Sequence, residues 1–250
     1  MEAALSIIEA LILGAIQGIT EFLPISSSGH LILGQKLFGF DKLDQYILFD
    51  LICHIGTLLP ICLLFSDQLK KVISKKVILG TLPLFPLLLV LSPIKSLYSD
   101  PKYLGFFFLL TALLLLMGKR VRARRATGAF DTVIIGTFQA FAILPGVSRS
   151  GATISSAKTL GWSNEEAVRF SFLLAIPAIL GGMVVESLTL IRTPQPLLEP
   201  TVYAAGFFSS MIVGFGALSL LVQLVKKEKL HYFVWYCLIL GAYTLWTFRS

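Results

Sequence analysis

The feature that most constrains this chain is a succession of long apolar stretches, each close in length to the thickness of a lipid bilayer. A helix needs about 20 mostly apolar residues to cross the hydrocarbon core, and six stretches come near that length: 46–66, 76–94, 103–118, 166–187, 202–225 and 231–248. Only 14% of the 250 residues are charged, whereas soluble domains carry about a quarter. The chain is therefore expected to be an all-α integral membrane protein with about six transmembrane helices.

The few charges are distributed unevenly between the loops. The formal net charge is +7, but the basic residues form short clusters between apolar stretches, so they predict membrane orientation and no nucleic-acid partner. If the spans alternate, one side receives Lys70, Lys71, Lys75, Lys76, Lys119, Arg120, Arg122, Arg124, Arg125, Lys226, Lys227 and Lys229. By the positive-inside rule, this side is expected to be cytoplasmic. The three cysteines lie singly within apolar stretches, so neither a disulfide framework nor a thiolate metal site is expected.

Two further apolar segments are interrupted by polar loops. Residues 3–22 lead to Pro24 and a Ser/Gly loop, and residues 130–144 lead to Pro145 and a second loop of the same kind. Each segment is predicted to be a helix, a polar loop and a short second helix. Because the loops are too polar to face lipid and each helix is too short to cross alone, we expect two re-entrant helix-loop-helix pairs buried in protein.

The two halves of the chain resemble one another. A shift of 122 residues aligns Gly14 with Gly136, Gln17 with Gln139, Ser26 with Ser148, Ser28 with Ser150, Gly29 with Gly151 and Ile32 with Ile154. We interpret residues 1–250 as one membrane domain made of two repeats, 1–125 and 126–250. If each repeat holds a re-entrant pair and three spans, the second is inverted and the two loops meet near the bilayer midplane. The first pair then enters from outside and the second from the cytoplasm.

The candidate site residues lie on these two loops, and the halves contribute different chemical types. The first half supplies an acid, an imidazole and three hydroxyls: Glu21, His30, Ser26, Ser27 and Ser28. The second supplies a guanidinium and three hydroxyls: Arg149, Ser148, Ser150 and Thr153. An ionisable group at membrane depth costs about 2.5–3.5 kcal/mol on insertion scales, so these groups are functional candidates.

These residue types suit a phosphate ligand. Arg149 offers planar, bidentate donors for a pair of phosphate oxygens. Each second helix is expected to begin near a glycine, Gly29 or Gly151, so unpaired backbone N–H groups and two helix dipoles would point at the same place. The predicted substrate-binding residues are Ser26, Ser28, Gly29, Ser148, Ser150, Gly151 and Thr153.

A carboxylate beside a phosphate requires a compensating cation. The simplest solution is a hard divalent ion, Mg²⁺ or Ca²⁺, that bridges Glu21 and phosphate oxygens. His30 can act as a general acid or base or accept the phosphoryl group, and Ser27 and water are the other candidate nucleophiles. A purely structural alternative has the loops capping the half-helices while Arg149 pairs with Glu21, but the cost of charge at the midplane disfavours it.

Polar residues outside the two loops are predicted to have structural roles. Asp50 and His54 lie one turn apart on the stretch 46–66, where they either support the site or form a mutual hydrogen bond, and the sequence favours the mutual hydrogen bond. Ser163 and Glu166 match a helix capping box, so the acid needs no catalytic explanation.

Both loop motifs resemble the signature motifs of a known family. The segments QGITEFLPISSSGH at 17–30 and LPGVSRSGAT at 144–153 are similar to the two motifs of the bacterial undecaprenyl-diphosphatase (bacitracin-resistance, BacA-type) family, and the similarity extends to 49–57 and 170–177. The resemblance implies a phosphatase of the bacterial plasma membrane that removes the terminal phosphate of a C55 isoprenoid diphosphate. This reaction regenerates the monophosphate carrier for peptidoglycan and other envelope polymers and confers bacitracin resistance.

The resemblance also implies site roles. It implies dependence on Mg²⁺ or Ca²⁺, catalytic roles for Glu21, Ser27, His30 and Arg149, and a site that opens to the outer face. The family's first motif usually carries two acids four residues apart, whereas the earlier position here is Gln17. A glutamine on the same helix face offers a carbonyl oxygen but no charge, so the expected metal ligands are Glu21 with Gln17 as a neutral partner.

Two other functions fit part of the pattern. A secondary transporter or flippase of an anionic isoprenoid lipid is the main alternative, because inverted repeats with broken helices are typical of transporters. A phosphatidic-acid-phosphatase-type enzyme is disfavoured: Ser28-Gly29-His30 is similar to its central motif, but the chain has no Arg-Pro dipeptide and no histidine at the needed spacing after Arg149. The sequence leaves open whether the chain forms a homodimer.

Overall fold

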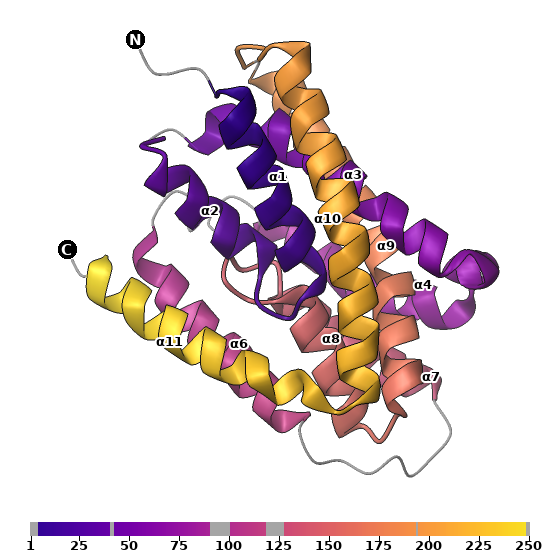
Figure 1. Ribbon diagram of the computed structural model, residues 1–250. Helices are drawn as coiled ribbons and strands as arrows, with labels where there is room; N and C mark the ends of the chain where they lie inside the picture. The colour runs from indigo at the N-terminus through magenta and orange to yellow at the C-terminus, as the bar shows by residue number, and fades with distance from the viewer. Residues whose placement is uncertain (1–4, 41–42, 91–100, 119–127, 194, 249–250) are drawn as a thin grey trace.

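The fold is built from helices, as the sequence predicts. The computed structural model describes residues 5–40, 43–90, 101–118, 128–193 and 195–248, and no strand occurs among them (Figure 1). The α-helices are α1 (Ile7–Phe22), α2 (Ser27–Leu37), α3 (Ile47–Leu64), α4 (Lys75–Thr81), α6 (Leu104–Met117), α7 (Ala129–Phe141), α8 (Arg149–Thr159), α9 (Asn164–Arg192), α10 (Pro200–Lys226) and α11 (Tyr232–Thr247). Short 3₁₀ segments connect them: η1 (Leu43–Tyr46), η2 (Ser66–Ile73), η3 (Leu82–Val90), η4 (Pro101–Tyr103) and η5 (Lys229–His231).

The apolar stretches form helices of unequal length. Three described helices, α3, α9 and α10, are long and apolar enough to cross a membrane, and they correspond to three of the six predicted spans. Helices α6 and α11 contain 14 and 16 residues, so at 1.5 Å per residue they reach only about 21 and 24 Å. The coarser prediction of a multi-pass helical membrane protein is confirmed.

The predicted span at 76–94 is not one continuous α-helix in its described part. It begins as α4 and continues as η3 through Val90, and residues 91–94 lie outside the described residues. The segment contains Pro83 and Pro86, which remove backbone donors and clash with the preceding turn. Hydropathy alone cannot predict this change from an α-helix to a 3₁₀-helix.

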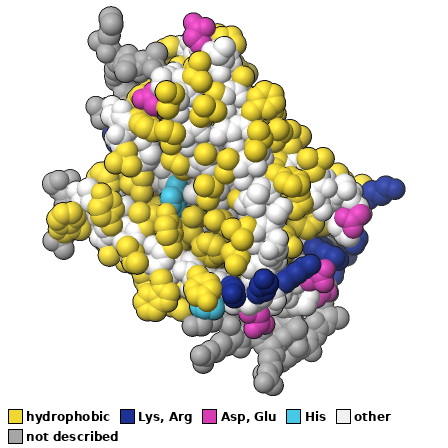
Figure 2. All heavy atoms as spheres, in the orientation of Figure 1, with side chains coloured by type: hydrophobic (Ala, Val, Ile, Leu, Met, Phe, Trp, Pro, Cys, Tyr) yellow, Lys and Arg dark blue, Asp and Glu magenta, His cyan; other side chains and the backbone are white. Residues whose placement is uncertain are grey.

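Small residues allow the helices to approach closely. A Cβ atom built on Gly14 of α1 would lie 2.6 Å from the Gly206 carbonyl oxygen of α10, and one built on Gly105 of α6 would lie 2.7 Å from the Gly241 carbonyl oxygen of α11. Gly136 of α7 contacts the backbone of α4 in the same way. Such small-residue contacts are typical of helices packed in a membrane, and hydrophobic side chains, many of them large and exposed, spread over the face seen in Figure 2.

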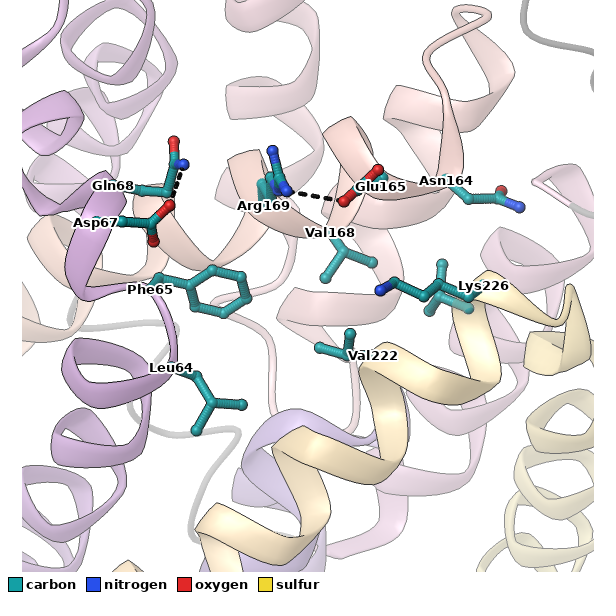
Figure 3. A pocket seen from close by; sticks show the side chains of 11 residues that line it. Leu64, Phe65, Asp67, Gln68, Asn164, Glu165, Val168, Arg169, Val222 and Lys226 are labelled. Atoms are coloured by element: carbon teal, nitrogen blue, oxygen red, sulfur yellow. Dashed lines mark hydrogen bonds and ion pairs between the residues drawn. The ribbon is translucent and has the colours of Figure 1, made fainter.

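Basic residues gather at one end of the molecule. Figure 2 shows Lys and Arg along one rim, and a pocket brings together Asp67 after α3, Arg169 at the start of α9 and Lys226 at the end of α10 (Figure 3). The clusters at 70–76 and 226–229 therefore lie at the same end. The cluster at 119–125 lies outside the described residues.

Helices α1 and α7 start at opposite ends. Near the start of α1, the carbonyl oxygen of Leu11 accepts a hydrogen bond at 2.7 Å from Ser209, which lies in the first half of α10, away from Lys226. At the start of α7, Asp131 accepts a hydrogen bond at 3.0 Å from the indole of Trp162, and Lys76 of the basic rim lies 5.8 Å from the centroid of that indole.

Candidate active site

A buried carboxylate joins the two polar loops. Glu21 is in the last turn of α1 and is 8% exposed. Its Oε1 accepts a hydrogen bond at 2.6 Å from Nη2 of Arg149, the first residue of α8. Its Oε2 accepts one at 2.7 Å from the Ser27 hydroxyl and one at 3.1 Å from the Gln17 amide. The structure thus brings four predicted site residues together, while their chemical roles stay predictions.

The first loop is held in an unusual backbone conformation. Helix α1 ends before Pro24, and Ser26 adopts φ of 74°, a left-handed value that costs a non-glycine residue about 1–3 kcal/mol. The Ser26 hydroxyl caps α2 by accepting the N–H of Gly29 at 3.4 Å, and it also accepts the N–H of Gly146 at 3.1 Å. These two contacts compensate the strain and tie the first loop to the second.

The second loop is fixed by α6 as well as by its own cap. Ser148 caps α8 by accepting the N–H of Gly151 at 3.1 Å. The Thr111 hydroxyl of α6 donates to the Gly146 carbonyl at 2.8 Å and accepts the Ser148 N–H at 2.9 Å. Sequence reasoning missed Thr111, because a single threonine within an apolar stretch carries no distinguishing signal. The result is a rigid platform from which Arg149 reaches Glu21.

The predicted substrate-binding residues make hydrogen bonds within the protein. The N-cap serines Ser26 and Ser148 accept the N–H groups of Gly29 and Gly151, so an anion would have to use other N–H groups at the two helix starts. Other predicted donors also have partners: Ser28 lies 3.4 Å from Ser26, Ser150 lies 3.2 Å from Ser148, and Thr153 lies 2.6 Å from Ser171, each measured between hydroxyl oxygens. Direct phosphate binding by these residues stays a prediction.

His30 is turned away from the carboxylate. Its Nδ1 lies 2.6 Å from the Ser26 carbonyl oxygen, and its Nε2 lies 2.7 Å from the Tyr236 hydroxyl of α11. No described hydrogen bond or ion pair joins His30 to Glu21 or Arg149. Of the three ionisable groups that were expected to meet, Glu21 and Arg149 are in contact. The imidazole of His30 lies on the α11 side of the loop.

A different histidine lies beside the carboxylate. His54 of α3 places Nε2 3.8 Å from Glu21 Oε2, and its Nδ1 lies 2.8 Å from the backbone oxygen of Asp50. The Asp50 carboxylate instead accepts from the Gln35 amide at 3.1 and 3.3 Å. The predicted hydrogen bond between Asp50 and His54 is present, but it joins the imidazole to the Asp50 backbone and not to its carboxylate, and His54 also lies beside Glu21. Two polar residues one turn apart within a membrane span, as Asp50 and His54 are, are the sequence signal that could have placed His54 at the site.

Some polar atoms at this centre are left without partners. Arg149 Nη1 and Gln17 Oε1 are buried and make no hydrogen bond to any described residue. Both amide atoms of Gln139, the counterpart of Gln17 in the second half, are in the same state. Leaving a buried polar atom unpaired costs about 1–3 kcal/mol, so a donor on Arg149 and an acceptor on Gln17 are available to a ligand.

The oxygen atoms around Glu21 match part of the coordination that Mg²⁺ or Ca²⁺ prefers. Among the described residues, no group of three or more His, Cys, Asp or Glu side chains is arranged to hold a metal ion. Glu21 and the unpaired Gln17 Oε1 supply two oxygen donors, and Mg²⁺ is usually held by one or two carboxylates together with substrate phosphates. The residues fit a cation that the substrate also coordinates, rather than one that the protein holds alone.

The pocket in Figure 3 is separate from this centre. Its charged lining residues include Arg169 and Glu165, which form an ion pair at 2.7 Å, and neither Glu21 nor Arg149 lines it. Neither polar loop therefore contributes a residue to this pocket.

Fold and site define a class: a multi-pass helical membrane protein in which two broken helices bring an acid, a hydroxyl and a guanidinium together. The family model described as "Bacitracin resistance protein BacA" matches residues 10–243. The chain belongs to this family.

Curated relatives share nearly the full length of the chain. A protein of Protochlamydia amoebophila (strain UWE25) named "Undecaprenyl-diphosphatase" is 48% identical, and the alignment covers 98% of this chain and 100% of that protein. Proteins with the same name from Carboxydothermus hydrogenoformans and Korarchaeum cryptofilum are 38% and 35% identical, over 94% and 95% of this chain and 94% and 97% of their own lengths.

Proposed function

We propose that this protein is a membrane phosphatase that hydrolyses undecaprenyl diphosphate to undecaprenyl phosphate and inorganic phosphate. The observation that carries the proposal is the buried contact of Glu21 with both Arg149 and Ser27, at 2.6 and 2.7 Å. A hydroxyl within hydrogen-bond reach of a base, beside a guanidinium, is the arrangement expected for phosphoryl transfer. The product is the lipid carrier for peptidoglycan and envelope synthesis, and its regeneration confers bacitracin resistance.

The geometry favours Ser27 as the nucleophile over water or His30. Ser27 Oγ would form a bond to the terminal phosphorus while the bond from that phosphorus to the bridging oxygen breaks, and undecaprenyl phosphate would leave with the bonding electrons. Glu21 Oε2, 2.7 Å from the hydroxyl, would take the serine proton. Water would then attack the phosphoserine, release inorganic phosphate and restore Ser27.

Charge stabilisation falls to Arg149. Its Nη2 is held by Glu21, while Nη1 is buried and free of described partners. That free donor can bind an oxygen of the transferring phosphoryl group, where negative charge must be stabilised. A bound Mg²⁺ or Ca²⁺ would neutralise phosphate charge, with Glu21 and Gln17 as its protein ligands.

The architecture assigned to the site is an inverted repeat whose loops meet near the bilayer midplane. Contacts between the halves support it. Helix α1 packs on α10 through Gly14, and its repeat counterpart α7 packs on α4 through Gly136. Helices α1 and α7 also begin at opposite ends of the described structure. The gathering of Lys and Arg at one rim supports a cytoplasmic assignment for that end in the bacterial plasma membrane, with the site open to the outer face.

Phosphate release is the direct test of this proposal. Purified protein in detergent is expected to release phosphate from a long-chain isoprenyl diphosphate when Mg²⁺ or Ca²⁺ is present. EDTA is expected to lower the rate by at least about tenfold, because the uncompensated phosphate charge would repel Glu21. Colorimetric phosphate determination measures both rates, and readdition of the metal is the control. An inactive protein in the presence of either metal would contradict the phosphatase assignment.

A transporter or flippase remains the second candidate, because the contacts that support the inverted repeat also fit a transporter. The variant Glu21→Gln keeps the shape of the side chain but removes the base, so it is expected to release no phosphate. In liposomes, it is also expected to move labelled undecaprenyl phosphate no faster than protein-free vesicles, as measured by the accessibility of the label from outside. Lipid movement by this inactive variant would instead support the transporter.

A further inference from the structure

The last helix, α11, contributes a side chain to the histidine of the first loop. We propose that Tyr236 is a positioning residue for His30, whose imidazole it orients and whose tautomer it helps to set through a hydrogen bond at Nε2. The inference rests on the proposed function and takes His30 as a general acid or base, one of the roles that the sequence predicts for it.

Hydrogen bonds on both ring nitrogens define the state of His30. Nδ1 lies 2.6 Å from the Ser26 carbonyl oxygen, and because a carbonyl oxygen can only accept, Nδ1 carries a proton. In the neutral ring Nε2 is then the acceptor, so the Tyr236 hydroxyl, 2.7 Å away, donates to it. The neutral ring is held as a single tautomer with its lone pair on Nε2, directed at α11.

A tyrosine hydroxyl suits a ring that must change its protonation state. The hydroxyl is both a donor and an acceptor. When Nε2 gains a proton, the Tyr236 oxygen can accept it as a hydrogen bond without any movement of either ring. A general acid or base gains and loses one proton in each turnover, so a partner that serves both states keeps His30 in place throughout the cycle.

Ring packing fixes the plane of the imidazole. The rings of His30 and Tyr236 are stacked, with centroids 5.6 Å apart and planes inclined by 12°. Phe108 of α6 meets the imidazole edge-on, with centroids 5.4 Å apart and an angle of 74°. These rings come from α2, α6 and α11, and the last two helices are held together at Gly105 and Gly241. No described acidic or basic side chain makes a hydrogen bond or ion pair with His30.

The variant Tyr236→Phe tests the hydroxyl while leaving the ring stack intact. Phosphate release is expected to fall about five- to tenfold in kcat, as for one lost hydrogen bond, with KM changed less than about twofold. The matched control is Tyr243→Phe on the same helix, where the tyrosine is 51% exposed and its hydroxyl makes no hydrogen bond to any described residue. This control is expected to retain wild-type kcat. Wild-type kcat in Tyr236→Phe would overturn the inference.

Nitrogen NMR separates positioning from a general loss of packing. Protein labelled with ¹⁵N-histidine contains three imidazoles, and substitution of each histidine in turn assigns them. In Tyr236→Phe, the Nε2 resonance of His30 is expected to shift, while those of His54 and His231 stay in place. An unchanged His30 resonance would overturn the inference even if kcat falls. The NMR measurement does not depend on activity. An inactive wild type would refute the proposed function, but it would not refute the hydrogen bond between His30 and Tyr236.

A double-substitution cycle adds a kinetic criterion. If Tyr236 acts through His30, then adding Tyr236→Phe to a His30→Gln background is expected to change kcat by less than about twofold, because the partner is already lost. A full five- to tenfold further loss in that background would mean that Tyr236 acts independently of His30, and would overturn the assignment.

Discussion

Replacing Arg149 with alanine is expected to lower phosphate release by at least about a thousandfold, the scale on which guanidinium groups contribute to phosphoryl transfer. Two effects combine. The substitution removes the buried donor Nη1 that is available to the phosphoryl group, and it leaves Glu21 as an uncompensated buried charge. Arg149→Lys is expected to recover only a small part of the rate, since an ammonium restores the charge but not the fork of donors.

Arg169→Ala is the matched control for this experiment. Arg169 also pairs with a glutamate, Glu165, at 2.7 Å, but the pair is exposed at the basic rim. An exposed ion pair contributes little to stability, typically about 0–1 kcal/mol, so this variant is expected to keep at least about half of the wild-type rate. Full activity in Arg149→Ala, or an equal loss in both variants, would contradict a site built on Arg149.

The substitution Gly136→Val is expected to have the largest effect on folding. Its Cβ would overlap the carbonyl oxygen of Gly80, so α7 and α4 would have to separate. Overpacking typically costs about 1–3 kcal/mol, and a clash with backbone cannot be relieved by a side-chain rotation. We expect a loss at the upper end of that range, equivalent to a fall in Tm of about 6–12 °C. Thermal unfolding of the detergent-solubilised protein measures it.

The same substitution at Gly216 serves as the control. Gly216 lies within α10, and a Cβ built there meets no described atom within 4 Å. Gly216→Val is expected to leave Tm within a few degrees of the wild type, because the added methyl groups face open space. A Tm unchanged by Gly136→Val would mean that α4 and α7 do not pack through their glycines.

The sequence predicts the helical class and the meeting of the loops for identifiable physical reasons. Apolar length identifies helices, and the internal repeat predicts that the loop carrying Glu21 meets the loop carrying Arg149. The repeat cannot predict which N–H groups remain free, because Ser26 and Ser148 serve as caps and use those of Gly29 and Gly151.

Residues on the spans were harder to predict than residues on the loops. In an apolar helix the hydropathy pattern does not reveal which face meets the site, because lipid-facing and protein-facing positions are equally apolar. His54 therefore could not be assigned to Glu21, and Tyr236 could not be assigned to His30. Only the packing of α3 and α11 against the loops brings these pairs together.

The contact between Glu21 and Arg149 has a consequence for electroneutrality. As an ionised pair, the two side chains carry no net charge, so they can lie together within the low-dielectric interior. An incoming diphosphate ends that balance, because Arg149 has no second positive charge to offer and Glu21 is already negative. A Mg²⁺ or Ca²⁺ ion held by Glu21, Gln17 and the substrate phosphates would supply the missing positive charge.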